Sequence, residues 1–216
     1  MKVCYDLYVI TDKALSKGRT SVEIVEQAIL GGATLVQYRA KNAPGRDMVQ
    51  EALALLEVTR RYKIPLIIND RVDVALAVDA EGVHLGQEDI PCTLARKLIG
   101  PDKILGISAS SVEEALQAEK DGADYLGVGA VFPTGTKADA GDAIGLEGLR
   151  AVRKAVNIPI VAIGGINADN AAAVAATGIA GLSVVSAIVS APDPKQAAQT
   201  LKQAFVQGQS QINFPR

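Results

Sequence analysis

The sequence predicts an α/β protein with a single-domain (β/α)8 barrel, and three observations lead to this fold. Short runs of apolar and β-branched residues alternate with longer segments of helical period, which is typical of βα units on a parallel sheet. Eight such units fit into 216 residues, which suits a closed barrel at the small end of its size range. The segments GGATLVQYR, DGADYLGVG and TGIAGLSVV also repeat one pattern, in which a glycine that can end a helix is followed directly by a strand.

Eight short runs are the expected strands, and helical patterns lie between them. In chain order the strands span residues 7–11, 34–39, 66–70, 82–86, 104–108, 125–131, 159–165 and 182–186. The helical patterns include residues 20–32, 48–62, 72–78, 91–100, 111–123 and 146–156. Each helix presents one apolar face, which we expect to pack against the outside of the barrel.

The domain boundary and the alternative fold follow from the same patterns. The barrel is expected over residues 1–206, and the polar, aperiodic tail 207–216 is expected to be flexible. An open doubly wound sheet is the alternative fold. Its dinucleotide-binding form would carry G-x-G-x-x-G after the first strand, whereas this chain has YVITDKALSKG there.

Composition argues against several classes of function. The chain has 22 basic and 24 acidic residues and a net charge of −2, which argues against a nucleic-acid partner and a basic membrane-binding surface. Cys4 and Cys92 are far apart and in no metal-binding spacing, so neither a disulfide framework nor structural zinc is expected. No apolar stretch approaches about 18 residues. We therefore expect a cytoplasmic protein, and a homo-oligomer is compatible with the sequence.

Polar residues follow the predicted strands, at the end where the parallel strands of a barrel converge. The second strand ends in Gln37 and Arg39, with Lys41 just beyond, and the three alternate along an extended segment, which directs their side chains to one side. Such residues could simply begin a polar loop. A strand buried on both faces should nevertheless read as a continuous apolar run, so cations here favour binding of an anion such as phosphate.

Two aspartates supply the opposite charge at the next strand ends. Asp70 and Asp89 each precede a helical pattern, so one interpretation is that they cap those helices. The other is a Mg²⁺ site, because Mg²⁺ takes one or two carboxylates and completes its coordination with water and substrate phosphate oxygens. Carboxylates beside cations would then suit a diphosphate that carries a metal ion.

The later strand ends suggest a second anion site. Gly164 and Gly165 follow the seventh strand, where glycine lets backbone N–H groups approach a phosphate closely, although a tight βα turn would also use glycine. FPTGTK, residues 132–137, follows the sixth strand with two threonines and a lysine. His84 is interpreted as a hydrogen-bonded core residue, and Tyr8, Tyr38 and Tyr125 are interpreted as packing groups.

With these motifs in place, the chain resembles the thiamine phosphate synthase family over about residues 5–206. The motifs that carry the resemblance are YVITD (8–12), QYRAK (37–41), NDR (69–71), GVHLGQED (82–89), GIS (106–108), DYLGVGAVFPTGTK (124–137), IGLEGLR (144–150), PIVAIGGI (159–166) and VVSAI (184–188). Each motif alone is weak, whereas their order and spacing together are specific. The resemblance implies a TIM barrel that joins hydroxymethylpyrimidine diphosphate to thiazole phosphate, requires Mg²⁺ and releases diphosphate.

The resemblance also implies a role for each part of the site. Arg39, Lys41 and Lys137 would be the catalytic residues. The pyrimidine diphosphate would be bound by Gln37, Tyr38, Arg39, Ala40, Lys41, Asn69, Ser108 and Lys137. The thiazole phosphate would be bound by Thr134, Gly135, Thr136, Gly165, Val185 and Ser186, and Mg²⁺ would be bound by Asp70 and Asp89. Tyr38, Ala40 and Gly135 stand where the family often has other residues.

The implied chemistry is a dissociative substitution. Diphosphate leaves the pyrimidine methylene, the aminopyrimidine stabilises the carbocation, and the thiazole nitrogen captures it. FPTGTK and the following ADAGDA (138–143) would be a loop that closes over the substrates, or a plain connection. Rival functions on the same fold are a thiazole tautomerase-like enzyme, a sugar-phosphate isomerase or epimerase, and a non-catalytic phosphate-binding barrel. The complete set of motifs favours the synthase.

Overall fold

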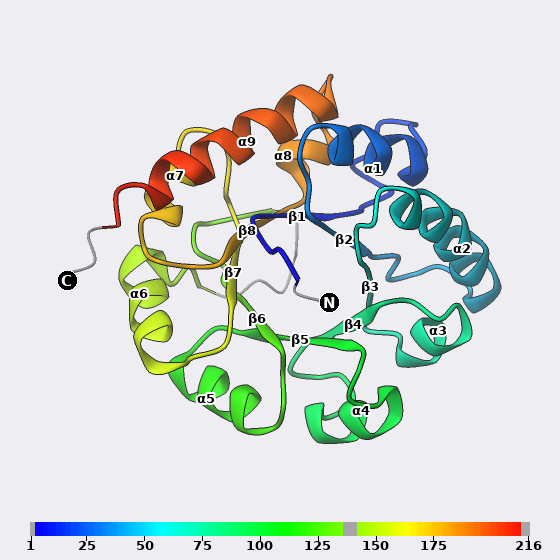
Figure 1. Cartoon of the computed structure of the whole chain (residues 1–216), viewed down its shortest axis with the longest axis horizontal. Helices are drawn as coiled ribbons and strands as arrows, with labels where there is room; N and C mark the ends of the chain where they lie inside the picture. Colours follow the sequence, from blue (N-terminus) through cyan, green and yellow to red (C-terminus); the bar gives the residue numbers. More distant parts are fainter. Residues whose placement is uncertain (1–2, 136–141, 213–216) are drawn as a thin grey trace.

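Eight parallel strands form a closed barrel with helices around it (Figure 1). The computed structural model describes residues 3–135 and 142–212. The order of the strands around the barrel follows the chain, and β8 pairs with β1 to close the sheet. The predicted barrel is confirmed, and the open doubly wound sheet is wrong.

The elements match the predicted alternation, and every strand except β5 is shorter than expected. The strands are β1 (Leu7–Ile10), β2 (Leu35–Tyr38), β3 (Leu66–Asn69), β4 (Gly82–Leu85), β5 (Ile104–Ala109), β6 (Tyr125–Val128), β7 (Ile160–Ile163) and β8 (Gly181–Val184). The helices are α1 (Ser21–Leu30), α2 (Gly45–Arg61), α3 (Val72–Ala77), α4 (Cys92–Ile99), α5 (Val112–Lys120), α6 (Gly145–Ala155), α7 (Ala171–Ala175), α8 (Ser186–Val189) and α9 (Pro194–Gln209).

Alternating side chains along the strands divide the apolar residues into two cores. In β2, Val36 and Tyr38 belong to the large outer core between the barrel and the helices, whereas Leu35 belongs to the barrel interior. The interior core consists of Tyr5, Tyr8, Leu35, Ile67, Tyr125 and Val161. Both faces of the strands are therefore buried, which explains why the strand sequences read as nearly continuous apolar runs.

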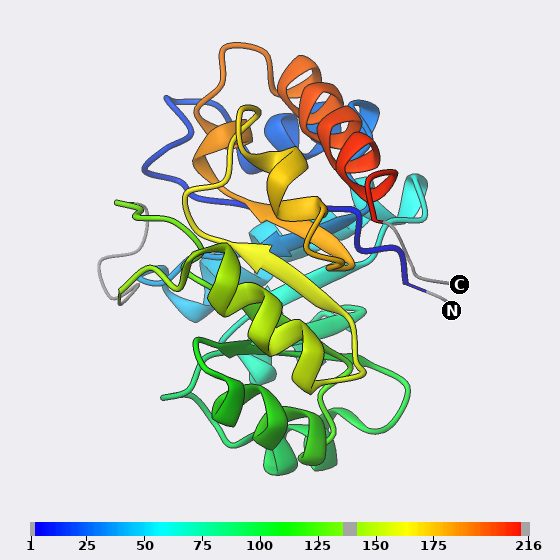
Figure 2. The ribbon, with the colours of Figure 1, turned by 90° about the vertical axis from the view of Figure 1, so that its left-hand side faces the viewer.

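The direction of the strands decides where a site can form. Figure 2 shows the strands running toward one side of the molecule, while the segment before β1 and the end of α9 lie at the other side. Loops after the strands therefore meet at one mouth of the barrel, away from the described ends of the chain. This is the end at which (β/α)8 barrels place their ligand sites.

The C-terminal helix continues beyond the expected domain boundary. Helix α9 ends at Gln209, although a flexible tail was expected from residue 207. Gly208 is buried against α7, where a Cβ atom would lie 2.2 Å from the backbone oxygen of Ala172. This contact explains why helical packing extends past residue 206. Residues 213–216 lie outside the described part of the chain.

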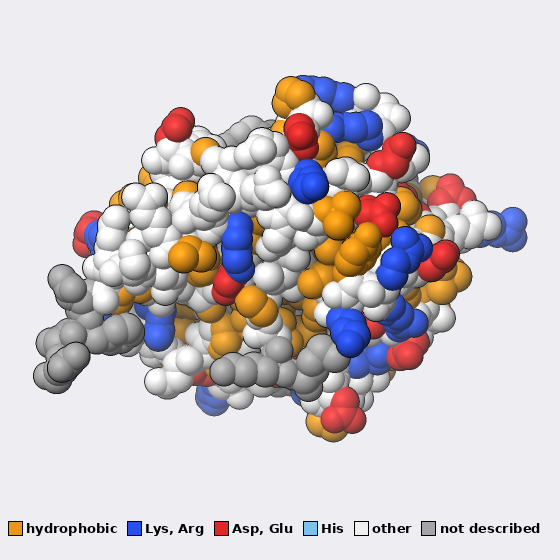
Figure 3. Space-filling view, turned by 45° about the horizontal axis from the view of Figure 1, so that its top comes forward, with side chains coloured by type: hydrophobic (Ala, Val, Ile, Leu, Met, Phe, Trp, Pro, Cys, Tyr) orange, Lys and Arg blue, Asp and Glu red, His pale blue; other side chains and the backbone are white. Residues whose placement is uncertain are grey.

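The surface agrees with the near-neutral composition. Acidic and basic side chains are interspersed over the face drawn in Figure 3. None of the helices within residues 3–135 and 142–212 has the length and apolar character needed to span a bilayer.

Replacing Gly106 by alanine should destabilise the barrel. A Cβ at this position of β5 would lie 2.1 Å from the ring of Tyr125, which fills the interior beside it. Overpacking of this kind costs about 1–3 kcal/mol, so thermal unfolding should occur at least about 2–4 °C lower. Gly45→Ala is the matched control, because its Cβ would make only an ordinary contact at 3.6 Å from Arg71. Equal melting temperatures for the two variants would contradict this description of the interior.

Candidate functional site

The carboxyl ends of the strands and the loops after them carry most of the predicted site residues at one mouth of the barrel. The residues placed on these segments are Gln37, Arg39, Lys41, Asn69, Asp70, Asp89, Ser108, Thr134, Gly135, Gly165, Val185 and Ser186. Thr136 and Lys137 lie outside the described residues, so the roles expected for them stay predictions. The mouth thus combines groups from strands that are far apart in the sequence.

Asp70 and Asp89 form a carboxyl pair. The pKa of Asp70 is raised to about 6, first by burial and then by the charge of Asp89 and a hydrogen bond with its carboxyl group. Lys41 and Asn69 act on Asp70 in the opposite direction. Two carboxyl groups held this close disfavour double ionisation, and a divalent cation between them would reverse that preference.

The alternative interpretation of this pair as helix caps is wrong. The residues that precede α3 and α4 are Arg71 and Pro91, and neither helix start has a side-chain cap. Asp89 instead accepts a hydrogen bond at 2.6 Å from the backbone N–H of Gly86, within its own loop. Both carboxyl groups are therefore held by the loops after β3 and β4 rather than by the helices that follow.

The backbone at Asp70 is also unusual. Its φ of 62° lies in the left-handed region, which is costly for a residue with a side chain. The Asp70 N–H donates to the His84 carbonyl at 2.8 Å, which ties the end of β3 to β4 in this conformation. Strained residues of this type cluster at functional sites, because the surrounding fold must hold them.

The Asp70–Asp89 carboxyl pair is a feature of the mouth that suits a metal ion. Among the described residues, His, Cys, Asp and Glu side chains form no group of three that could hold an ion. A two-carboxylate site fits Mg²⁺, which fills its remaining positions with water and ligand oxygens, better than it fits zinc.

Arg39 is positioned by the first loop of the barrel. Its Nη1 lies 3.1 Å from Oδ2 of Asp12, and both side chains are mostly buried. Its backbone N–H donates to Oγ1 of Thr11 at 3.0 Å. Asp12 belongs to the YVITD motif and was not among the residues predicted to form the site. An acidic residue directly after the first strand was the available signal, because that strand is paired with β2.

A chain of hydrogen bonds crosses the barrel interior below the mouth. Gln37 Nε2 donates to the Tyr8 hydroxyl at 2.8 Å, and the Tyr8 and Tyr125 hydroxyls lie 2.8 Å apart. Tyr125 contacts His84 Nδ1 at 2.9 Å, and His84 Nε2 lies 3.0 Å from Ser108 Oγ. His84 is thus the hydrogen-bonded core residue that was expected, whereas the two tyrosines do more than pack.

Tyr38 and Ala40 are not brought to the same place as their neighbours in the segment. The Tyr38 side chain lies in the outer core, and its hydroxyl donates to Glu51 on α2 at 2.8 Å. Ala40 packs against the same outer core. The alternation that directs Gln37 into the barrel directs Tyr38 away from it.

The loops after β6 and β7 are joined backbone to backbone. Val131 N–H and Phe132 N–H donate to the carbonyls of Ile163 and Gly164, at 2.9 and 3.0 Å. Gly164 and Gly165 have φ values of 99° and 66°, and a Cβ on Gly165 would lie 2.7 Å from Cβ of Phe132. Glycine is therefore needed here both for the turn and for the close approach of the two loops.

The end of β8 completes the mouth. Val185 leads into α8, a short extra helix that starts at the exposed Ser186. In (β/α)8 barrels the loops after the seventh and eighth strands, together with such a helix, are a frequent phosphate site. Thr134 on the neighbouring loop is half-buried.

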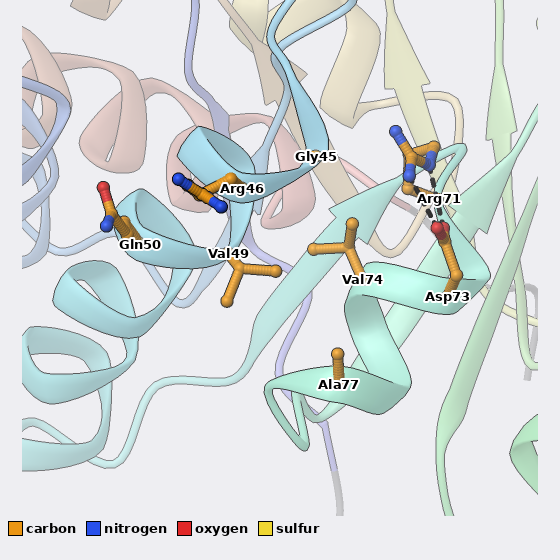
Figure 4. A pocket seen from close by; sticks show the side chains of 8 residues that line it. All are labelled: Gly45, Arg46, Val49, Gln50, Arg71, Asp73, Val74 and Ala77. Carbon is orange, nitrogen blue, oxygen red and sulfur yellow. Dashed lines mark hydrogen bonds and ion pairs between the residues drawn. The ribbon is translucent and has the colours of Figure 1, made fainter.

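A separate groove of about 570 Å³ lies on the outside of the barrel between α2 and α3 (Figure 4). Arg71, the third residue of the NDR motif, lines this groove and is ion-paired with Asp73, with Nε 2.8 Å from Oδ1. Its side chain therefore does not join Asn69 and Asp70 in the site. The groove holds none of the residues predicted to bind a ligand.

Comparisons with known proteins agree on one family. The family described as thiamine monophosphate synthase matches residues 7–188. A thiamine-phosphate synthase of Chloroflexus aurantiacus is 60% identical over 200 residues, covering 93% of this chain and 92% of the relative. One from Moorella thermoacetica is 54% identical over 199 residues, covering 92% and 95%.

Solved structures agree with the sequence comparison. Thiamine phosphate pyrophosphorylase from Pyrococcus furiosus superimposes with a TM-score of 0.87 at 51% identity, covering 94% of this chain and 96% of that one. A 3-hexulose-6-phosphate synthase from Salmonella typhimurium reaches a TM-score of 0.69 at 17% identity, covering 94% and 99%. The second likeness concerns the fold alone.

Asp70→Asn should stabilise the protein in the absence of metal at pH 8. The raised pKa of Asp70 means that its ionised form is disfavoured in the folded state, so stability is lost as pH rises through about 6. Because Asp70 is only half-buried, we expect a gain of about 1 kcal/mol and a melting temperature higher by about 2–4 °C. At pH 4, where the folded-state carboxyl is protonated, the gain should nearly vanish. A gain of the same size at both pH values would contradict this explanation.

Affinity for a divalent cation should fall as the pH drops below about 6. Protons then compete with the metal for Asp70, whose pKa is raised to about 6. Calorimetric titration with Mg²⁺ in the presence of diphosphate at pH 5.5 and 7.5 would measure this. Equal affinity at both pH values would mean that Asp70 does not bind the metal.

Proposed function

Because the chain belongs to the thiamine monophosphate synthase family, we propose that it is a transferase that joins hydroxymethylpyrimidine diphosphate to thiazole phosphate. The products would be thiamine phosphate and diphosphate. The observation that carries the proposal is the placement of Arg39 and Lys41 at the same mouth as the Asp70–Asp89 pair. A diphosphate with a divalent cation needs both kinds of charge.

Mg²⁺ fits the carboxyl pair. The raised pKa of Asp70 reports an environment in which a second negative charge is disfavoured, and a dication would relieve it. Two carboxylates leave positions for water and diphosphate oxygens. When bound, Mg²⁺ would neutralise charge on the diphosphate and so make it a better leaving group.

The chain's own side chains would act on the departing diphosphate. In the proposed reaction the bond from the pyrimidine methylene carbon to a diphosphate oxygen breaks, and a bond from the thiazole nitrogen to that carbon forms. The diphosphate keeps the bonding electrons, so groups that meet growing negative charge lower the barrier. Arg39, which is held by Asp12, and Lys41 would supply this positive charge from the end of β2. Lys137 would add a third cation from the loop after β6.

The second substrate would lie against the later strand ends. Gly165 follows β7 and would meet the phosphate with its backbone, and Ser186 begins the short helix α8. Thr134 would add a hydroxyl donor from the neighbouring loop. This arrangement would orient the thiazole nitrogen toward the methylene carbon, and positioning is the main contribution a protein can make to such a substitution.

Rival functions explain less of the site. A thiazole tautomerase-like enzyme or a sugar-phosphate isomerase would use the loops after β7 and β8 and would leave the Asp70–Asp89 pair without a role. A non-catalytic barrel would bind both ligands without turnover. The two enzyme alternatives do not account for two cations and two carboxyl groups at one mouth, and turnover distinguishes the synthase from the non-catalytic barrel.

Thiamine phosphate formation tests the proposal directly. Purified protein with both substrates should give product in Mg²⁺ and none after the metal is removed with a chelator. Folded protein that binds thiazole phosphate but forms no product in Mg²⁺ would favour the tautomerase-like or non-catalytic alternative. Product formation in the presence of the chelator would support the synthase activity and contradict the requirement for a metal ion.

Lys137→Ala should lower turnover by about 10²-fold or more, by analogy with the loss of one donor to a developing anion. Lys97→Ala, on the exposed face of α4, is the matched control for loss of a lysine. Steady-state kinetics with both substrates saturating would measure the effect. Turnover of Lys137→Ala within twofold of the control would remove Lys137 from the mechanism.

A further inference from the structure

The hydrogen-bonded chain inside the barrel occupies space that the strands leave open for it. A Cβ on Gly127 of β6 would lie 2.9 Å from Cε1 of His84, and a Cβ on Gly106 would meet the Tyr125 ring. Two strand positions without side chains therefore make room for Tyr125 and His84. Packing alone would be served better by apolar residues, which need no partners.

The donors and acceptors of this hydrogen-bonded chain all point the same way, because each phenol has only one proton to donate. Burial raises the pKa of the Tyr8 and Tyr125 phenols, so both keep that proton. Tyr8 accepts from Gln37 Nε2, so its own proton goes to the Tyr125 oxygen. Tyr125 then donates to Nδ1 of His84. This direction requires the His84 tautomer with its proton on Nε2, which lies 3.0 Å from Ser108 Oγ and would donate to it.

The two ends of this directed chain lie at the mouth. With Nε2 of Gln37 donating to Tyr8, the Oε1 of the same amide is the acceptor that remains for a ligand. At the other end, Ser108 Oγ accepts from His84 and keeps its own proton for a further partner. The chain thus presents an acceptor on β2 and a donor on β5.

We infer that Tyr8 and Tyr125 are positioning residues, which act through the direction of this chain to fix Gln37 as an acceptor and Ser108 as a donor toward the pyrimidine substrate. This inference rests on the proposed function. An aminopyrimidine carries N–H groups that need an acceptor, and its diphosphate needs donors. The reverse direction would present the Gln37 amide N–H, which cannot accept from the amino group, and a Ser108 lone pair, which cannot donate to the diphosphate.

His84 is the single histidine of the protein, so the direction of the hydrogen bonds can be measured without substrate. A long-range ¹H–¹⁵N correlation spectrum of ¹⁵N-labelled protein at pH 8 contains imidazole signals from His84 alone. We expect the tautomer with the proton on Nε2 and an unprotonated Nδ1. The opposite tautomer, or an even mixture of the two, would overturn the inference.

Three tyrosine variants separate positioning from packing. Tyr125→Phe removes the donor to His84 and leaves the Tyr8 proton free to turn toward Gln37, so the preference for one tautomer should weaken. Tyr8→Phe frees Gln37 but leaves Tyr125 donating to His84, so the tautomer should persist. Tyr5→Phe is the control, because Tyr5 packs on the Tyr125 ring at 5.2 Å and its hydroxyl has no hydrogen bond among the described residues.

The same variants should differ in their KM for the pyrimidine diphosphate. Tyr8→Phe and Tyr125→Phe should each raise KM for the pyrimidine diphosphate about 3- to 10-fold, the effect of one neutral hydrogen bond, and leave KM for thiazole phosphate unchanged. Tyr5→Phe should change neither. Equal increases for both substrates, or equal effects of all three variants, would assign the tyrosines to packing and overturn the inference.

Failure of the proposed function would be seen separately. Wild-type protein that forms no product would reject the synthase, while the tautomer measurement would still decide the direction of the chain. Wild-type protein that forms product, with variants that retain its KM for the pyrimidine diphosphate, would reject the positioning role alone.

Discussion

Closing eight parallel strands into a small barrel creates an interior that the strands' own side chains must fill, and the rest of this structure depends on how that is done. Here the interior core is apolar and aromatic, and it includes Leu35 and Val161. Tyr125, itself a member of this core, and His84 lie against the strand glycines Gly106 and Gly127 and bring polar atoms with them. Buried polar atoms are costly without partners, so these residues form a connected chain rather than isolated groups.

The mouth adds charge to this polar layer. Arg39 is fixed by Asp12, and Asp70 is held in a left-handed backbone conformation beside Asp89. The arrangement at Asp70 costs stability in the protein alone, because the charge of Asp89 opposes its ionisation and its backbone is strained. Under the proposed function, a metal-bound diphosphate would offset this cost by bringing a dication and an anion together.

Much of the fold could be predicted from the sequence, because strands buried on both faces have continuous apolar runs and each helix has one apolar face. The carboxyl ends of the strands could also be predicted to converge, which was enough to place Asp70 and Asp89 at one mouth. The helix-cap alternative could not be rejected from spacing alone, since the decisive facts are a 62° φ at Asp70 and the contact from Gly86 to Asp89.

The parts that could not be predicted depend on contacts across the barrel. Tyr8 and Tyr125 are 117 positions apart, and nothing local indicates that their hydroxyls meet. The pairing of Arg39 with Asp12 likewise needs the register of β1 against β2. Tyr38 and Gln37 are adjacent in the sequence, yet one faces the helices and the other the interior, which only the strand alternation decides.

A crystal structure with thiamine phosphate, diphosphate and Mn²⁺ in place of Mg²⁺ would test the central claim most directly, because anomalous scattering identifies the metal. We expect the ion between Asp70 and Asp89, with the diphosphate against Arg39 and Lys41 and the thiamine phosphate extending toward Gly165. Diphosphate and metal bound in the outer groove between α2 and α3, or at the mouth without either carboxylate, would contradict the account.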